Sequence, residues 1–243
     1  MKLLLISNST NPGEPYLGWP QSFISDFTKR HQVKNVLFVP YAGVNLSPDS
    51  IEESYNLYEK KVADVFNSLG LKLKSIHTET DQVKAVENAD CIAVGGGNTF
   101  HLVAMMHTTG IMHAIRQKAL SGSPFMGWSA GANVACPTLR TTNDMPIIQP
   151  LSFDCLNLVP FQINPHYLDA NPTGHGGETR QQRIEEFLAI NRSINVLGLR
   201  ESSLLDIDGI SMMLKGNRGM RLFRFGHEPL EFEPESDLSS LLR

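Results

Sequence analysis

The sequence predicts an α/β fold, with a mostly parallel β-sheet and helices on both of its faces. Short apolar runs alternate along most of the chain with stretches of helical spacing. Runs that are apolar throughout are typical of parallel strands, because both of their faces are buried. Glycine-rich turns follow two of these runs, as they do where a strand leads into a helix. The 243 residues, 41% of them apolar, predict a single domain over residues 1–243.

The N-terminal part contains two predicted strands, over residues 2–7 and 35–40. Each has four consecutive apolar side chains and ends at a polar or proline-containing turn. Between them, residues 12–20 are rich in Pro and Gly and are expected to form a loop. An amphipathic segment around residues 23–27 follows this loop. The order strand, helix, strand is therefore expected.

Residues 50–69 carry the clearest helical pattern in the chain. Apolar side chains recur there at steps of three and four, at Ile51, Tyr55, Tyr58, Val62, Val65 and Leu69. Gly70 then stands where a helix commonly ends in glycine. Residues 72–77 and 91–94 are predicted strands, with a short helical segment over residues 81–88 between them. Strands that alternate with helices in this way indicate a parallel sheet.

The C-terminal part changes character. Residues 196–199 form one more apolar run, and after Ser203 short apolar segments alternate with glycines. We expect these segments to be short antiparallel strands, a small C-terminal element at the sheet edge. The tail after about residue 228 is acidic and is expected to pack loosely.

Composition excludes several classes of function. The net charge is −4, the pI is about 6.1, and no run of Lys or Arg occurs, so neither nucleic acid nor an anionic membrane is an expected partner. The three cysteines lack CxxC spacing, which argues against a disulfide framework and a structural zinc site. No segment has the apolar length of a signal peptide or a membrane span. A cytosolic protein that acts on a small molecule or peptide is expected.

The segment Gly127-Trp128-Ser129-Ala130-Gly131 has the G-x-S-x-G form of a nucleophile elbow. In such an elbow a serine on a tight turn between strand and helix presents its hydroxyl to solvent, and glycines on both sides allow the backbone to close. The backbone N–H groups that follow can stabilise an oxyanion. A turn that only joins strand to helix is the alternative.

A second glycine turn, residues 95–99, also follows a predicted strand and precedes a helix. Its three successive glycines could direct backbone N–H groups at an anion, so the turn could bind phosphate or supply an oxyanion donor. It lacks G-x-G-x-x-G spacing, which makes nucleotide binding the weaker hypothesis. A turn without a ligand stays open.

Four further residues are candidates for chemistry. His166 follows an Asn-Pro turn and is a candidate general base for an upstream serine. Asp144 lies in a polar loop, where it could simply form a turn. Arg180 stands at a predicted helix start, where a cation is unfavourable, so it is a candidate to bind a carboxylate. Glu201 follows the strand over residues 196–199, at the sheet edge where α/β folds place ligands.

Taken together, five motifs closely resemble those of the peptidase E family. This family comprises the α-aspartyl dipeptidases among the serine peptidases, and the cyanophycinases are its relatives. These motifs are Val94 to Phe100, Gly127 to Asn133, Arg140 to Pro146, Ile163 to His166 and Gly177 to Arg180. The resemblance extends from Leu3 to about Glu201. It implies a fold similar to class I glutamine amidotransferases, with serine in place of their cysteine nucleophile. It also implies a cytoplasmic enzyme that needs no cofactor or metal and hydrolyses dipeptides with an N-terminal aspartate.

The mechanism implied by the resemblance assigns Ser129 as the nucleophile and His166 as the base, with an acyl-enzyme intermediate. Backbone N–H groups near Gly97 and Ala130 would hold the oxyanion. Two carboxylates, those of Asp144 and Glu201, match the acid that orients the base. The sequence does not choose between them.

Specificity for aspartate requires a cation for the substrate carboxylate, and Arg180 matches the family's candidate. The substrate's free ammonium needs an acceptor, for which Asn98 or a nearby carboxylate is available.

Two alternative functions compete with this one. The first is a broader serine hydrolase, such as a cyanophycinase-like peptidase acting on β-aspartyl bonds. The second is a flavodoxin-like binding module without enzymatic activity that uses residues 95–99 for a phosphate. The sequence leaves homo-oligomerisation open.

Overall fold

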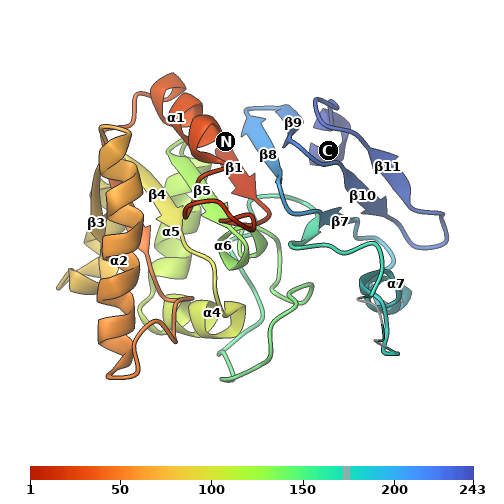
Figure 1. Ribbon diagram of the computed structural model, residues 1–243, viewed down its shortest axis with the longest axis horizontal. Helices are drawn as coiled ribbons and strands as arrows, with labels where there is room; N and C mark the ends of the chain where they lie inside the picture. Colours follow the sequence, from red (N-terminus) through yellow and green to blue (C-terminus); the bar gives the residue numbers. More distant parts are fainter. Residues whose placement is uncertain (172–173, 175) are drawn as a thin grey trace.

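A seven-stranded sheet forms the centre of the computed structural model, which describes residues 1–171, 174 and 176–243 (Figure 1). Its strand order is β3-β2-β4-β5-β1-β8-β9, and the pairs among the first five are parallel. The strands are β1 (Lys2–Ile6), β2 (Asn35–Val39), β3 (Lys72–Ser75), β4 (Cys91–Val94), β5 (Pro124–Trp128), β8 (Ser203–Asp208) and β9 (Ser211–Gly216). This confirms the predicted α/β fold with a mostly parallel sheet.

Helices cover both faces of this sheet. The cluster of buried side chains on one face includes those of α1 (Gln21–Arg30) and α2 (Ile51–Ser68), which lie in front of the sheet in Figure 1. The other face packs against α3, α4, α5 and α6. These four helices are Gln82–Asn88, Thr99–Thr108, Ile111–Leu120 and Ala130–Asn133.

The predicted ends of α2 have the expected local chemistry. The Ser50 hydroxyl accepts a hydrogen bond from the Glu53 backbone N–H at 3.0 Å, which caps the helix start. Gly70 follows the helix with a φ of +76°, a conformation that favours glycine.

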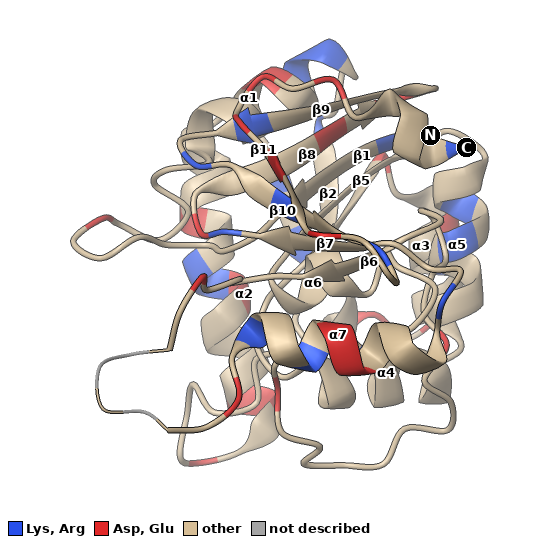
Figure 2. Ribbon diagram, turned by 90° about the vertical axis from the view of Figure 1, so that its right-hand side faces the viewer, with Lys and Arg blue, Asp and Glu red and all other residues tan. Residues whose placement is uncertain are grey.

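A second, four-stranded sheet adjoins the first, with strand order β11-β10-β7-β6. Its strands are β6 (Gln162–Asn164), β7 (Val196–Leu199), β10 (Met220–Phe223) and β11 (Leu230–Phe232), and helix α7 (Arg180–Ile190) lies against it. Figure 2 faces this side of the molecule and shows α7 beside β6 and β7, with basic residues toward its N-terminal end. The predicted C-terminal strands are therefore divided: β8 and β9 extend the large sheet as an antiparallel hairpin, while β10 and β11 belong to the small one.

The tail after residue 228, for which the sequence suggested loose packing, makes specific contacts. Strand β11 pairs with β10, and the Leu238 backbone N–H donates to the Met212 carbonyl at 2.8 Å. The side chains of Leu238 and Leu241 are buried in the main core cluster. Burial of the two leucines stabilises the packed tail, because each one removes apolar surface from water.

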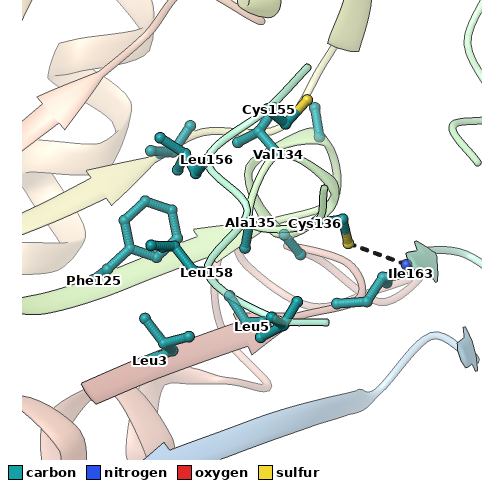
Figure 3. Close-up of a cluster of buried hydrophobic side chains, with 14 of the residues drawn as sticks. Leu3, Leu5, Phe125, Val134, Ala135, Cys136, Cys155, Leu156, Leu158 and Ile163 are labelled. Atoms are coloured by element: carbon teal, nitrogen blue, oxygen red, sulfur yellow. Dashed lines mark hydrogen bonds between the residues drawn. The ribbon is translucent and has the colours of Figure 1, made fainter. Parts of the chain in front are cut away.

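The main core cluster lies between the large sheet and the segments that follow Ser129. Figure 3 shows Leu3, Leu5 and Phe125 of the sheet near Leu158, with Val134 and Ala135 above them. In the same view the Ile163 backbone N–H donates to Cys136 Sγ, at 3.1 Å. This contact ties the start of the small sheet to the segment that leaves the elbow.

No helix in residues 1–171, 174 and 176–243 is long and apolar enough to cross a membrane.

The buried carboxylate of Asp206 and its two basic partners predict how stability depends on pH. Burial alone would raise the pKa of Asp206, but hydrogen bonds from Arg30 and Lys215 outweigh it and lower the pKa below the ordinary value of 3.8. The carboxylate therefore contributes stability above that ordinary value, and this contribution is lost as the pH falls through the lowered value. At pH 7, Asp206→Asn should reduce the free energy of unfolding by about 1–3 kcal/mol.

Urea titrations of both proteins at pH 7 and pH 3 would measure this loss. The difference in the free energy of unfolding between wild type and variant should shrink at pH 3. The control Asp64→Asn, at an exposed position on α2, should leave the free energy of unfolding unchanged at both pH values. An equal difference at both pH values would contradict the role given to the carboxylate charge.

Candidate active site

Ser129 lies on a sharp turn between β5 and α6, in the strained backbone of an elbow. Its φ and ψ are 54° and −113°, and its backbone N–H donates to the Ile6 carbonyl at the end of β1, at 3.0 Å. A Cβ atom at Gly127 would overlap the Gly131 carbonyl, and one at Gly131 would overlap the Val94 carbonyl. Both glycines of the G-x-S-x-G motif are therefore required by close packing of the backbone.

Trp128, the residue before the serine, anchors the elbow. Its indole N–H donates to the hydroxyls of Tyr16 and Tyr58, at 3.0 and 3.1 Å. The Tyr16 hydroxyl donates to that of Tyr58, which in turn donates to the Gly96 carbonyl. This buried network joins the elbow to α2 and to the second glycine turn.

The three glycines of that second turn are explained by packing. A Cβ at Gly95 would lie 2.6 Å from the Tyr58 hydroxyl, and one at Gly96 would lie 2.9 Å from the Ser129 Cβ. Gly97 has a φ of +133°, and a Cβ there would overlap the Ala42 carbonyl. The turn thus brings the backbone of residues 95–97 against the nucleophile elbow.

Two backbone N–H groups near Ser129 are available to an oxyanion. Within the described residues, the Gly97 N–H donates to no backbone carbonyl. Ala130 is the first residue of α6, so its N–H has no partner inside that helix. Because α6 has four residues, these two N–H groups matter more here than a helix dipole does.

His166 and Glu201 form a hydrogen-bonded chain with Ser129. His166 Nε2 lies 2.9 Å from the Ser129 hydroxyl oxygen, and His166 Nδ1 lies 2.8 Å from Glu201 Oε1. The imidazole and the carboxylate are each about two-fifths exposed, at 39% and 40%. With Nδ1 protonated and bound to the carboxylate, Nε2 is free to accept the serine proton.

Ser7 and Asn8, which sequence reasoning treated only as a turn, hold this chain in place. The fully buried Ser7 hydroxyl donates to the Leu199 carbonyl at 2.8 Å and accepts the His166 backbone N–H at 3.0 Å. Asn8 Oδ1 accepts the backbone N–H of Ser202, the residue after Glu201, at 2.8 Å. Their position directly after a parallel strand was the available signal.

Asp144, the other candidate acid, makes no hydrogen bond to the His166 imidazole. Its Oδ2 accepts from the backbone N–H and the hydroxyl of Thr99, at 2.7 and 2.6 Å, and from the Thr142 hydroxyl at 3.0 Å. The neighbouring Asn143 donates to the Pro165 carbonyl, next to His166. The loop over residues 142–144 therefore contacts the segment that carries His166 but is not part of the hydrogen-bonded chain of Ser129, His166 and Glu201.

Arg180 is the first residue of α7, and its side chain lines a pocket of about 230 Å³ that also contains Ser129, His166 and Asp144. Thr179 caps the helix in a capping box with Gln182, so Arg180 is not needed at this end. Burial, and then the Arg183 charge, lower the pKa of Arg180, while the Asp144 charge raises it. Among the described residues, no carboxylate lies within 4.0 Å of the guanidinium.

Ser129 and His166 also line a larger cleft, of about 450 Å³. It shares only Ser129 and His166 with the Arg180 pocket, so the two spaces meet at the serine hydroxyl. Asn98 lines the larger cleft, but its side chain caps α4 through the His101 N–H and donates to the Met145 carbonyl. In the described ranges, no group of three or more His, Cys, Asp or Glu side chains is arranged to hold a metal ion.

A family model described as "Peptidase family S51" matches residues 3–215 of the chain. Among named relatives, the protein called Peptidase E of a Nostoc species is 47% identical over 241 residues, covering 99% of this chain and 96% of that protein. Peptidase E of Streptomyces coelicolor is 43% identical over 243 residues, covering 100% and 95%. Peptidase E of an Escherichia coli strain is 41% identical over 233 residues, covering 96% and 98%.

Solved structures share the fold. A peptidase from an acI-B1 Actinobacterium has a TM-score of 0.72 at 16% identity, covering 98% of this chain and 96% of that one. A crystal structure described as a putative peptidase E protein from Listeria monocytogenes has a TM-score of 0.62 at 24% identity, covering 89% and 98%.

The site geometry predicts different roles for the two carboxylates. Glu201→Gln should slow the labelling of Ser129 by a fluorophosphonate by more than about 100-fold, because the amide no longer holds the imidazole in the productive tautomer. Asp144→Asn should label at nearly the wild-type rate, since Asp144 does not contact His166. Labelling rates measured by mass spectrometry, with Ser129→Ala as the unlabelled control, would test this. Equal slowing in both variants would contradict the assignment.

Proposed function

Because this chain belongs to peptidase family S51, and so is a peptidase, we propose that it hydrolyses dipeptides with an N-terminal aspartate through an acyl-enzyme on Ser129. The observation that carries the proposal is the hydrogen-bonded chain from Ser129 through His166 to Glu201, beside a pocket where Arg180 forms no ion pair with any described residue. The family leaves the flavodoxin-like alternative without support.

The proposed reaction has two stages. His166 Nε2 removes the proton of the Ser129 hydroxyl as the oxygen attacks the scissile carbonyl. The N–H groups of Gly97 and Ala130 stabilise the resulting oxyanion. The peptide bond then breaks, and the imidazolium gives its proton to the leaving amine. Water, activated by His166, attacks the ester and releases the aspartate, while Glu201 stabilises the imidazolium in each stage.

The aspartate side chain binds Arg180 in this proposal. A carboxylate that leaves water for a partly enclosed pocket needs a fixed opposite charge, and the planar guanidinium can bind it through two parallel hydrogen bonds. Arg180 has no competing carboxylate partner within 4.0 Å in the described part of the chain. Its charge is therefore available to the substrate.

Asp144 binds the free ammonium of the substrate. All three hydrogen bonds to its carboxylate end on Oδ2, so among the described groups Oδ1 has no donor. Asp144 and Arg180 line the same pocket, beside Ser129. This places one negative and one positive group around a residue that carries an ammonium and a side-chain carboxylate, as an N-terminal aspartate does.

The chain's cysteines support the proposal that this peptidase acts in the cytoplasm. Cys91, Cys136 and Cys155 are buried free thiols, as is usual where the environment is reducing.

Removal of the Arg180 charge tests the substrate assignment. Arg180→Ala should lower kcat/KM for Asp-Leu by more than about tenfold, because it leaves the substrate carboxylate without its partner. Arg180→Lys should restore only part of the loss, since an ammonium cannot reproduce the two-donor geometry. Arg183→Ala, on the exposed side of the same helix, is the matched control. Fluorophosphonate labelling should stay unchanged in all three variants, and unchanged Asp-Leu hydrolysis in Arg180→Ala would remove Arg180 from the site.

A substrate panel tests the proposed pocket as a whole. Asp-Leu should be hydrolysed faster than Glu-Leu, and N-acetyl-Asp-Leu should be a poor substrate because it lacks the ammonium that Asp144 binds. Chromatographic assay of the released leucine would measure each rate. Faster hydrolysis of β-Asp-Leu than of Asp-Leu would instead support the cyanophycinase-like alternative.

A further inference from the structure

The larger cleft contains a positive charge that the proposed reaction has not yet used. Besides Ser129 and His166, its lining includes Lys61 of α2 and no carboxylate. The Lys61 ammonium lies 4.2 Å from the centre of the Tyr16 ring, a cation–π contact that holds it at the cleft. Within the residues that the structure describes, Lys61 forms no ion pair.

The position of the cleft determines which part of a substrate would enter it. The cleft and the Arg180 pocket share only Ser129 and His166. A peptide whose scissile carbonyl lies at the Ser129 hydroxyl, and whose aspartate fills the Arg180 pocket, has the larger cleft on the other side of Ser129 for its second residue. In a dipeptide that second residue ends in a free carboxylate.

We propose that the larger cleft binds the leaving residue of the dipeptide and that Lys61 binds its terminal carboxylate. This inference rests on the proposed function and extends it from the aspartate to the other half of the substrate. Because the carboxylate that Lys61 binds belongs to the residue directly after the scissile bond, the cleft would favour dipeptides over longer peptides.

The walls of the cleft are suited to an apolar leaving residue. Ala42, Val44 and Leu46 line the cleft on one segment, and the rings of Tyr16 and Tyr58 line it from two others. Tyr58 and Lys61 are three residues apart on α2, so they project from the same side of the helix. A leucine or phenylalanine side chain would contact these walls while its carboxylate reaches the ammonium.

The hydroxyls of the two tyrosines carry no negative charge that would pair with the ammonium. Burial raises the pKa of both Tyr16 and Tyr58, so their hydroxyls stay neutral. Both hydroxyls are also held in the network with Trp128. The Lys61 charge is thus the one formal positive charge, apart from a protonated His166, among the groups that line the cleft.

The test compares two substrates that differ only in this carboxylate, Asp-Leu and Asp-Leu-amide. Lys61→Met keeps much of the apolar stem and removes the charge. It should raise KM for Asp-Leu about five- to tenfold with little change in kcat, because the interaction is the same in ground and transition states. Hydrolysis of Asp-Leu-amide should be unchanged. Lys61→Arg should retain most of the Asp-Leu activity, and Lys60→Met, the exposed neighbour on α2, should behave as wild type.

The outcomes separate this inference from the function on which it rests. If Lys61→Met hydrolyses Asp-Leu as wild type does, or loses activity equally on both substrates, Lys61 does not bind the carboxylate. If wild type hydrolyses neither substrate while Ser129 still reacts with fluorophosphonate, the proposed specificity for aspartate fails, and the inference fails with it.

Discussion

The close contact of backbones beneath Ser129 is the constraint on which the site depends. The turn at Ser129 has a positive φ, which costs about 1–3 kcal/mol for a residue other than glycine. It persists because Gly127, Gly131 and Gly96 let neighbouring segments approach where a single Cβ would overlap them. The same contacts place the serine over the ends of strands β1, β4 and β5, which lie side by side in the sheet.

The two sheets contribute different parts of the site. Ser129 follows a strand of the large sheet, whereas His166 and Glu201 follow β6 and β7 of the small one. The Ser7 hydroxyl joins them, since it directly follows β1 and bonds to the backbone of His166 and of Leu199, the last residue of β7. The distance between Ser129 and His166 is therefore set by how the two sheets pack.

Much of this arrangement could be predicted from the sequence, because it depends on local patterns. Continuous apolar runs locate the parallel strands, and the spacing of G-x-S-x-G locates the elbow. Arg180 could be identified as a candidate because a cation at the start of a helix is also a local feature of the sequence. The choice between Asp144 and Glu201 could not be made, since it depends on a distance through space that no spacing along the chain encodes. The division of the last strands between two sheets was missed for a related reason, because short apolar segments do not specify their partners.

The contacts of Ser7 and Asn8 also determine when the enzyme can first act. Ser7 bonds to Leu199, 192 positions later in the chain, and Asn8 bonds to Ser202, 194 positions later. His166 and Glu201 can be held by these contacts only after the segment around residue 202 has been synthesised. In the proposed mechanism, the nascent protein is consequently inactive as a hydrolase until Glu201 has been synthesised and has reached His166.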